Sequence, residues 1–423
     1  MRVWLKDKEI DFTIFLCKND FILHNSQVLK NQNDVHEYYD VVISNPPYFK
    51  LPNKDERAIA ARSVIFGQTN IYTIFLLIAT KLLREDGQLI FITPRSFCSG
   101  NYFRLFREIF FFVVDLKAIH LFNSRKAAFK RDKVLQENII IEARLKRKSQ
   151  DSTQQLLDAC KEQIIVSSST GIDDIKTRRI KKYECSSLLN LDSYQKILFL
   201  PTSEKDEQII KIFKSWAGSL KLYDLEISTG PVVDFRIKNK IKFKKGKNTV
   251  PLFWLKNVES MKCLWPLRFG NNGNSKGQYI LSDKDSKSKL VQNRNLVFLR
   301  RFSSKDDKRR LIAAPYLGIN EHNSPLIGIE NHLNYIYHKT GELTIEQTIG
   351  LAAILNSQLF DRYFRTFNGN INVSATELRD FPLPNFNSIE VLGKKIRSLN
   401  EIKEAYNIDS LVTETLNLTI DLS

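Results

Sequence analysis

The chain has 423 residues, of which 43% are hydrophobic and 26% charged, the composition of a folded protein with two or three domains. Its net charge of +17 indicates a polyanionic partner, with nucleic acid the first candidate and an anionic membrane surface the second. No apolar run approaches the ~20 residues that cross a bilayer, so no membrane span is expected. Five scattered cysteines without a Cys-x-x-Cys pair and six histidines without metal-ligand spacing favour a reducing cytoplasm and predict no metal site.

The first half of the chain alternates predicted strands and helices, which indicates an α/β sheet. Residues 11–23 contain a strand-like run that ends at Asn19-Asp20, and further predicted strands span residues 41–44, 88–93, 113–120, 138–143 and 164–169. The predicted helices span residues 69–83 and 101–112. Asp86-Gly87 is expected to end the first helix, and Pro94 to stop the strand that follows it.

The second half predicts a separate domain that begins near residue 200. A helix at 204–216 opens it, short strands such as 252–255 and 296–301 follow, and a helix is expected at 344–363. Residues 231–310 contain 21 Lys and Arg against 6 Asp and Glu, so this basic window holds +15 of the net charge of +17. The window also contains Phe235, Phe243, Phe253, Trp254, Trp265, Phe298 and Phe302. Most of these rings are predicted to be core, and a minority to touch nucleic acid.

A four-residue motif, Asn45-Pro46-Pro47-Tyr48, directly follows the predicted strand at 41–44. Ligands of open α/β sheets bind beyond the carboxyl ends of the strands. Two adjacent prolines stiffen the loop, because they fix their own φ angles and restrict the residue before them. Such a loop can hold a planar amino group between two acceptors, Asn45 Oδ1 and the Pro46 carbonyl, with the Tyr48 ring on its face. A Pro-Pro turn without function is the alternative.

Residues 40–48, Asp-Val-Val-Ile-Ser-Asn-Pro-Pro-Tyr, resemble the catalytic motif of the gamma-class, TaqI-like N6-adenine DNA methyltransferases of restriction–modification systems. The resemblance implies that Asn45, Pro46, Pro47 and Tyr48 are catalytic, that S-adenosyl-L-methionine is the cofactor, and that double-stranded DNA is the partner. It also implies that Tyr48 stacks on one face of a flipped adenine and Phe129 on the other. Packing of Phe129 on the core as a loop anchor is the alternative.

A second segment, Asn19-Asp20-Phe21, is similar to the family's cofactor motif. The similarity implies that Asp20 accepts from the cofactor's adenine amino group and that Phe21 packs against its ring, with Pro47 as a further cofactor contact. The family's cofactor domain begins with a Gly-x-Gly-like loop, which this chain does not contain. We therefore expect a chain that lacks the first two strands of the domain. It is interpreted as a fragment, as one half of a split enzyme whose companion chain supplies the missing cofactor-binding segment, or as a decayed gene product.

The resemblance implies an α/β fold in which a partial Rossmann-like methyltransferase sheet, residues 1–200, precedes a mixed α+β target-recognition domain, residues 201–423. The leading hypothesis is a site-specific adenine DNA methyltransferase. A non-catalytic DNA-binding fragment or one half of a split methyltransferase is the alternative. A third hypothesis is methylation of a protein glutamine or of RNA, because the same motif can hold those amino groups; the basic window favours DNA.

Overall fold

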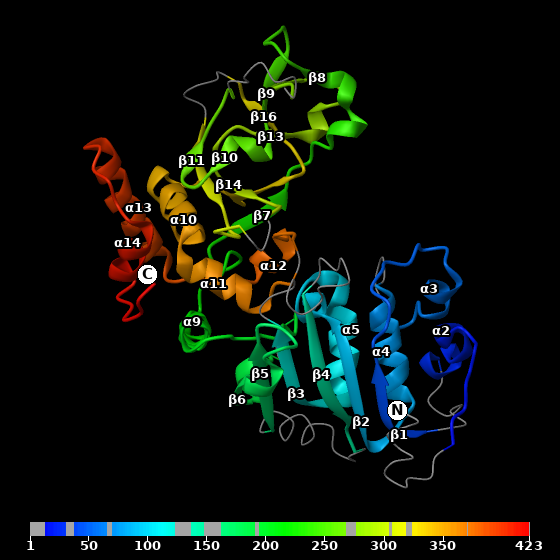
Figure 1. Ribbon diagram of the computed structural model, residues 1–423. Coiled ribbons are helices and arrows are strands. Elements are labelled where there is room, and N and C mark those ends of the chain that lie inside the picture. The colour runs from blue at the N-terminus through cyan, green and yellow to red at the C-terminus, as the bar shows by residue number, and fades with distance from the viewer. Residues whose placement is uncertain are drawn as a thin grey trace. The chain divides into compact units, whose positions relative to one another are not determined.

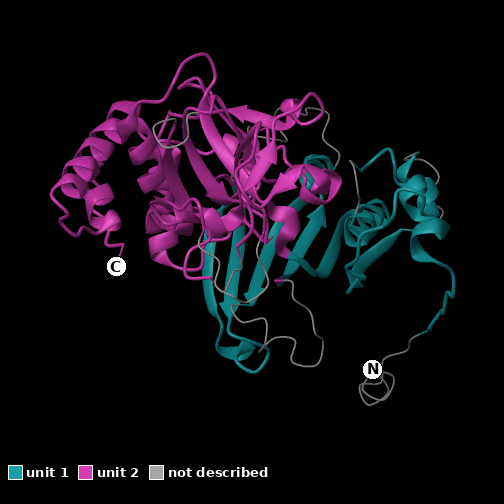
Figure 2. Cartoon of the chain, turned by 90° about the horizontal axis from the view of Figure 1, so that it is seen from above, with its two compact units in different colours: residues 1–94, 102–128, 138–185 teal, residues 95–101, 129–137, 186–423 magenta. Residues whose placement is uncertain are grey.

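The computed structural model describes residues 13–30, 38–65, 70–122, 137–147, 162–190, 194–267, 276–303, 307–318, 324–369 and 371–422. The chain forms two compact units (Figure 2). Unit 1 runs to Cys185 without the segment 95–101, and unit 2 consists of that segment and the chain from Ser186 onward, with Glu137. The assignment of catalytic and recognition roles to residues 1–200 and 201–423 stays a prediction.

Unit 1 is built on one six-stranded mixed sheet in the order β1-β2-β4-β3-β5-β6 (Figure 1). Its strands are β1 (Tyr39–Ser44), β2 (Leu83–Pro94), β3 (Val114–Phe122), β4 (Asn138–Leu145), β5 (Gln163–Ser169) and β6 (Arg179–Glu184). β1 runs parallel to β2 and β3 parallel to β5, while β4 is antiparallel to both of its neighbours. The α/β class predicted from the alternating pattern is therefore confirmed.

The helices of unit 1 are α2 (Phe21–His24), α3 (Glu56–Ala60), α4 (Ile71–Lys81) and α5 (Arg104–Val113). α4 and α5 pack on the sheet and against one another. The predicted apolar face of α4 is buried, with Ile74 and Leu77 at most 1% exposed, and most of its other residues are buried as well. The crossover from β1 through α4 to the parallel strand β2 brings the carboxyl ends of β1 and β2 to the same edge of the sheet.

One predicted strand of this unit is wrong in its described part. Residues 13–18 form no regular structure, and Phe21–His24 form the short helix α2. Asp20 is the N-cap of this helix, because its Oδ1 accepts the backbone N–H groups of Ile22 and Leu23 at 2.9 Å each. Because the Asp20 side chain already accepts these N–H groups, they stabilise a helical turn and are not available to pair with a strand.

Unit 2 contains a four-stranded antiparallel sheet, a five-stranded sheet and a two-stranded ribbon. The first has the order β15-β14-β17-β7 and consists of β7 (Leu225–Thr229), β14 (Asn295–Arg300), β15 (Ala313–Leu317) and β17 (Leu333–His338). The second has the order β13-β16-β9-β12-β8 and consists of β8 (Ile241–Lys242), β9 (Thr249–Phe253), β12 (Tyr279–Leu281), β13 (Leu290–Gln292) and β16 (Leu326–Ile329). The ribbon pairs β10 (Val258–Glu259) with β11 (Lys262–Cys263).

Helices of unit 2 form its largest apolar core together with the four-stranded sheet. They are α9 (Glu204–Ser215), α10 (Ile345–Asn356), α11 (Gln358–Phe367), α12 (Ala375–Arg379), α13 (Phe386–Glu401) and α14 (Ile408–Thr415), with α8 (Cys185–Leu188) at the start of the unit. The single helix predicted at 344–363 is wrong, because Ser357 breaks it. Ser357 has extended backbone angles, φ −70° and ψ 151°, and its hydroxyl accepts from Phe360 N at 3.3 Å as the N-cap of α11.

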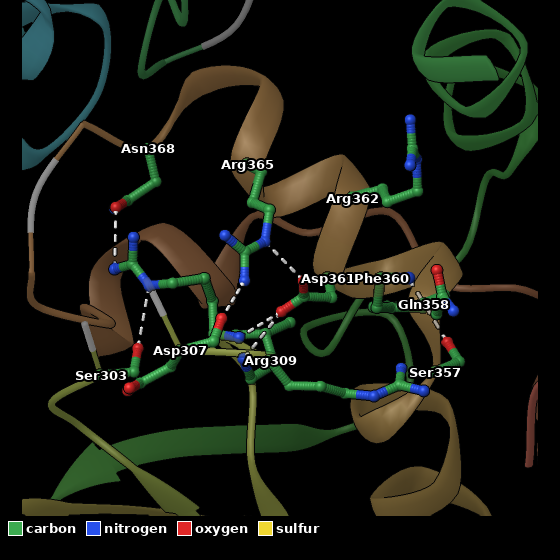
Figure 3. A network of polar contacts seen from close by, with 12 residues as sticks. Ser303, Asp307, Arg309, Ser357, Gln358, Phe360, Asp361, Arg362, Arg365 and Asn368 are labelled. Carbon is green, nitrogen blue, oxygen red and sulfur yellow. Dashed lines mark hydrogen bonds and ion pairs between the residues drawn. The ribbon is translucent and has the colours of Figure 1, made fainter. Parts of the chain in front are cut away.

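A buried polar network in unit 2 joins α11 to the segment before β15 (Figure 3). Asp361 Oδ1 accepts from the backbone N–H of Arg310 and, at 3.1 Å, from that of Leu311. Asp361 Oδ2 accepts from Arg365 Nε at 2.6 Å, and the 1% exposed Arg310 donates from Nε to Ser303 Oγ at 2.9 Å. The network satisfies groups that burial would otherwise leave without partners, although burial still lowers the pKa of Arg310 to about 10.

The segment 95–101 follows β2 directly in the chain, but its contacts lie in unit 2. Arg95 Nη2 donates to the carbonyl oxygens of Arg365 and Thr366 at 2.8 and 2.5 Å. Ser99 Oγ donates to Glu377 Oε1 at 2.7 Å, and both side chains are at most 2% exposed. Seven residues between two elements of unit 1 are thus built into the other unit.

Candidate active site

The Asn45–Tyr48 motif lies at the carboxyl end of β1, as the sequence predicts. β1 pairs in register with β2, with Ile43 opposite Ile90 and Ser44 opposite Phe91, so the loop leaves the sheet at a fixed point. Residues 45–49 have no regular structure. At the end of the loop, Phe49 accepts a hydrogen bond through its carbonyl from Ile71 N at 2.9 Å, which fixes the loop to the start of α4.

The Tyr48 hydroxyl contacts two acceptors within the site. It lies 2.5 Å from Asn45 Oδ1 and 2.9 Å from the Ile92 carbonyl oxygen of β2. Because a hydroxyl has one proton, it serves one of these acceptors fully at a time. Tyr48 therefore connects the amide of Asn45 to the neighbouring strand, and the bond to Ile92 leaves the hydroxyl a partner when Asn45 Oδ1 accepts from another donor.

The Tyr48 ring packs against a buried aromatic residue. Its centroid lies 6.3 Å from that of Tyr72 in an edge-to-face arrangement, and Tyr72 is fully buried in α4. Burial raises the pKa of the Tyr48 hydroxyl well above its ordinary value of 10.0, so the group stays protonated at neutral pH. Asn45 and Pro47 are exposed, whereas Pro46 is buried. The site thus presents an exposed amide beside a firmly held phenol.

Asp20 and Phe21, the predicted cofactor residues, belong to the same unit. Phe21 stacks on Phe75 of α4, with ring centroids 4.7 Å apart and planes at 22°. Asp20 uses Oδ1 to cap α2, and its side chain is 40% exposed. A carboxylate oxygen beside an aromatic ring suits an adenine whose amino group donates to the oxygen while its ring packs on the phenyl group. The predicted role of these two residues in binding the adenine of a cofactor stays a prediction.

Arg57 was not predicted, yet it lies between the two predicted clusters. Its guanidinium forms a two-pronged ion pair with Asp55 at 2.7 and 2.8 Å and lies 3.8 Å from Asp20 Oδ2. The same guanidinium sits 5.8 Å from the ring centroid of Phe49, the residue after Tyr48. Arg57 thus brings the end of the Asn45–Tyr48 loop and the Asp20 segment into one cluster. No motif marks it, because its role depends on contacts between distant segments.

Phe129, the second predicted stacking residue, lies outside the described residues. Within the described part of the chain, no group of three or more His, Cys, Asp or Glu side chains is placed to hold a metal ion. A search of those same residues finds no helix long and apolar enough to span a membrane.

The edge of the sheet beside the site is unusually apolar. Among the described strands, β1 pairs with β2 alone. Tyr39, Val41 and Ile43, which share one face of β1 because side chains alternate along a strand, are 45%, 47% and 72% exposed. A free edge with exposed apolar side chains is a pairing surface for another strand.

Comparison with known proteins gives a consistent set of relatives. Residues 5–129 match the family model described as Eco57I restriction-modification methylase. The chain is 34% identical over 374 residues to the type II methyltransferase M.BsuBI of Bacillus subtilis, covering 88% of this chain and 71% of that protein. It is 30% identical over 410 residues to the type II methyltransferase M.PstI of Providencia stuartii, covering 97% of this chain and 77% of that protein.

Proposed function

Since this chain belongs to the type II methyltransferases of restriction–modification systems, we propose that it takes part in site-specific transfer of a methyl group to adenine N6 in double-stranded DNA. The observation that carries the proposal is the loop at the carboxyl end of β1, in which Asn45 Oδ1 and the Tyr48 hydroxyl lie 2.5 Å apart. Asn45, Pro46, Pro47 and Tyr48 are the proposed catalytic residues.

The chemistry required is activation of a weak nucleophile. The lone pair of an exocyclic amine is delocalised into its ring, and acceptors on both N–H groups draw the nitrogen toward sp³ geometry and free that pair. Asn45 Oδ1 and the Pro46 carbonyl are the proposed acceptors, and the Tyr48 hydroxyl turns to Ile92 O when Asn45 Oδ1 accepts from the substrate. Fixed dipoles of this kind lower a barrier without a strong base.

The target base leaves the duplex to reach this loop, at a cost of a few kcal/mol. Stacking on Tyr48 offsets part of that cost, because its ring is held by Tyr72. Phe129 is the proposed second stacking residue.

S-adenosyl-L-methionine supplies the electrophilic methyl group when bound. Asp20 and Phe21 are the proposed contacts of its adenine, with Pro47 beside them. The fit of Asp20 and Phe21 to an adenine supports this assignment, and the remaining contacts are proposed to come from a segment that pairs with β1.

That pairing segment is the proposed companion of this chain. The edge of β1 that pairs with no other described strand and the 72% exposure of Ile43 support it. Calorimetric titration with S-adenosyl-L-methionine tests the idea. We expect weak binding by the chain alone and tight binding after co-expression with the part of M.BsuBI that it does not match. Equally tight binding in both preparations would contradict a need for the companion.

The function itself is tested by the modified nucleoside. Bacterial DNA that carries no methylation is incubated with the protein and labelled cofactor, with and without the companion segment, then digested to nucleosides and separated. We expect labelled N6-methyladenine, and its loss with Asn45→Ala. Label in N4-methylcytosine would contradict adenine as the target. DNA binding without any transfer in either preparation would support the alternative, a non-catalytic DNA-binding fragment.

A further inference from the structure

The connection between β7 and β9 contains a strongly basic and largely exposed segment. We call residues 234–248 the basic arm; they contain seven Lys and Arg and one Asp. The arm comprises two short 3₁₀ turns, Asp234–Arg236 and Lys238–Lys240, and the strand β8. Its residues from Lys242 to Asn248 are all exposed.

Two phenylalanine rings of the arm are exposed, in contrast to the rest of the basic window. Phe235 is 74% exposed and Phe243 is 65% exposed. Phe253, Trp254 and Phe298 are at most 5% exposed and belong to the apolar cores. Within the described part of unit 2, every other phenylalanine is buried or half-buried. An exposed apolar ring costs free energy in water, so two in one basic segment indicate a contact surface.

The lysines of the arm divide into anchored and unpaired groups. Lys240 forms ion pairs with Asp283 at 2.6 Å and Asp285 at 3.1 Å, which hold the arm to the segment after β12. Five others have no ion pair with any described carboxylate: Lys238, Lys242, Lys244, Lys245 and Lys247. Like charges at this density repel one another, and a polyanion relieves that repulsion.

The backbone of the arm is held at defined points. β8 pairs with β12, with Lys242 opposite Tyr279 and Ile241 opposite Ile280. At the far end, Gly246 N donates to Thr249 Oγ1 at 2.8 Å. A preorganised surface loses less conformational entropy on binding than a flexible tail does.

We propose that the basic arm is a DNA-contacting element, in which Lys244, Lys245 and Lys247 contact phosphates and Phe235 and Phe243 contact bases. The inference rests on the proposed function, since it names the surface that holds the duplex during methylation. A duplex fits both features, because its phosphates match the unpaired lysines and its bases offer faces or steps to an apolar ring. An anionic membrane fits the charge and is the competing outcome.

The lysine contacts are tested by the salt dependence of binding to a labelled 30-base-pair duplex of mixed sequence. The logarithm of the DNA association constant falls with the logarithm of the salt concentration, and each lost phosphate contact makes this slope less steep by about 0.9. The triple variant Lys244→Gln/Lys245→Gln/Lys247→Gln should therefore have a slope that is less steep by about 2 to 3. Lys394→Gln/Lys395→Gln/Lys403→Gln is the matched control. It removes the same charge from α13 and its end, which Figure 1 shows on the other side of unit 2 from β8. Equal slopes for the two variants would overturn the proposal.

The ring contacts are tested by position. Phe243→p-benzoylphenylalanine should crosslink to the duplex on illumination, whereas the same residue at Ile402, which is 68% exposed at the end of α13, should not. Phe243→Ala should weaken duplex binding roughly 5- to 100-fold. Equal crosslinking at both positions, or binding to anionic vesicles in preference to DNA, would refute the assignment. Neither assay measures methyl transfer. A protein that crosslinks at position 243 but transfers no methyl group would therefore contradict the proposed function and leave the proposed DNA contact standing.

Discussion

Replacing Tyr48 by phenylalanine separates the two roles proposed for this residue. Tyr48→Phe keeps the ring on Tyr72 and removes only the hydroxyl, which lies 2.5 Å from Asn45 Oδ1 and 2.9 Å from Ile92 O. Without the hydroxyl, the Asn45 amide loses the contact that holds Oδ1 in position until the substrate amine replaces it. The loss should appear in the rate of methyl transfer and leave DNA affinity nearly unchanged.

The size of the effect follows from the single proton of the hydroxyl. One hydrogen bond contributes about 0.5–1.5 kcal/mol, which corresponds to about 2- to 12-fold in rate. Asn45→Ala removes a proposed acceptor of the reacting amine, an electrostatic contact whose loss costs roughly 100- to 1,000-fold. Because the hydroxyl is argued to act through Asn45, Tyr48→Phe in the Asn45→Ala background should cost nothing further.

Single-turnover transfer of labelled methyl groups to saturating DNA measures all four proteins of this double-mutant cycle. Tyr48→Ala serves as a second control. Its transfer rate should be roughly 5- to 100-fold lower than that of Tyr48→Phe, because it also removes the stacking ring. If Tyr48→Phe slows the Asn45→Ala protein by the same factor as the wild type, the hydroxyl acts independently of Asn45 and the reasoning fails.

Three predictions concern stability and are checked by denaturant unfolding. A Cβ on Gly350 would lie 1.9 Å from the Ile389 carbonyl oxygen, so Gly350→Ala should lower the unfolding free energy by about 1–3 kcal/mol in spite of its better helix propensity, and a gain would contradict the packing. Ser203→Ala removes the cap that accepts from Asp206 N at 3.1 Å and should cost about 1 kcal/mol, while an unchanged midpoint would show that the cap is dispensable. Burial raises the pKa of Tyr363 above its ordinary value of 10.0, so the contribution of its neutral hydroxyl to the unfolding free energy is complete below pH 10.0 and is lost as the pH rises through the folded pKa. Tyr363→Phe should therefore reduce the loss of stability at alkaline pH. An unchanged dependence of stability on pH would exclude Tyr363 as the source of that loss.

Local pattern predicted the core of unit 1 well. Apolar spacing located α4, and short apolar runs located β1 to β5, because these elements bury a face or both faces whatever their neighbours are. The position of Asn45 at a strand end followed from the same pattern. β6 was missed, since Arg-Ile-Lys-Lys-Tyr-Glu has too few apolar residues to show as a strand; its pairing with β5 defines it.

Contacts between distant segments were beyond prediction from the sequence. Asp20 was expected at the end of a strand, but no strand precedes it in the described residues and its carboxylate caps a helix. Ser357 ends a helix that apolar spacing would continue. Arg57 has no motif, and its place beside Phe49 is visible only in the folded unit. Composition alone also could not separate the exposed Phe243 from the buried Phe253, because burial depends on how the strands pair.

The segment 95–101 has a consequence for attempts to give this enzyme family new DNA specificities by exchanging parts. Grafting a relative's sequence after residue 185 would leave Phe97 and Cys98, both fully buried, against side chains with which they did not evolve. It would also remove Glu377, the acceptor of the Ser99 hydroxyl. A chimera should therefore exchange the segment 95–101, which follows β2, together with the chain from Ser186 onward.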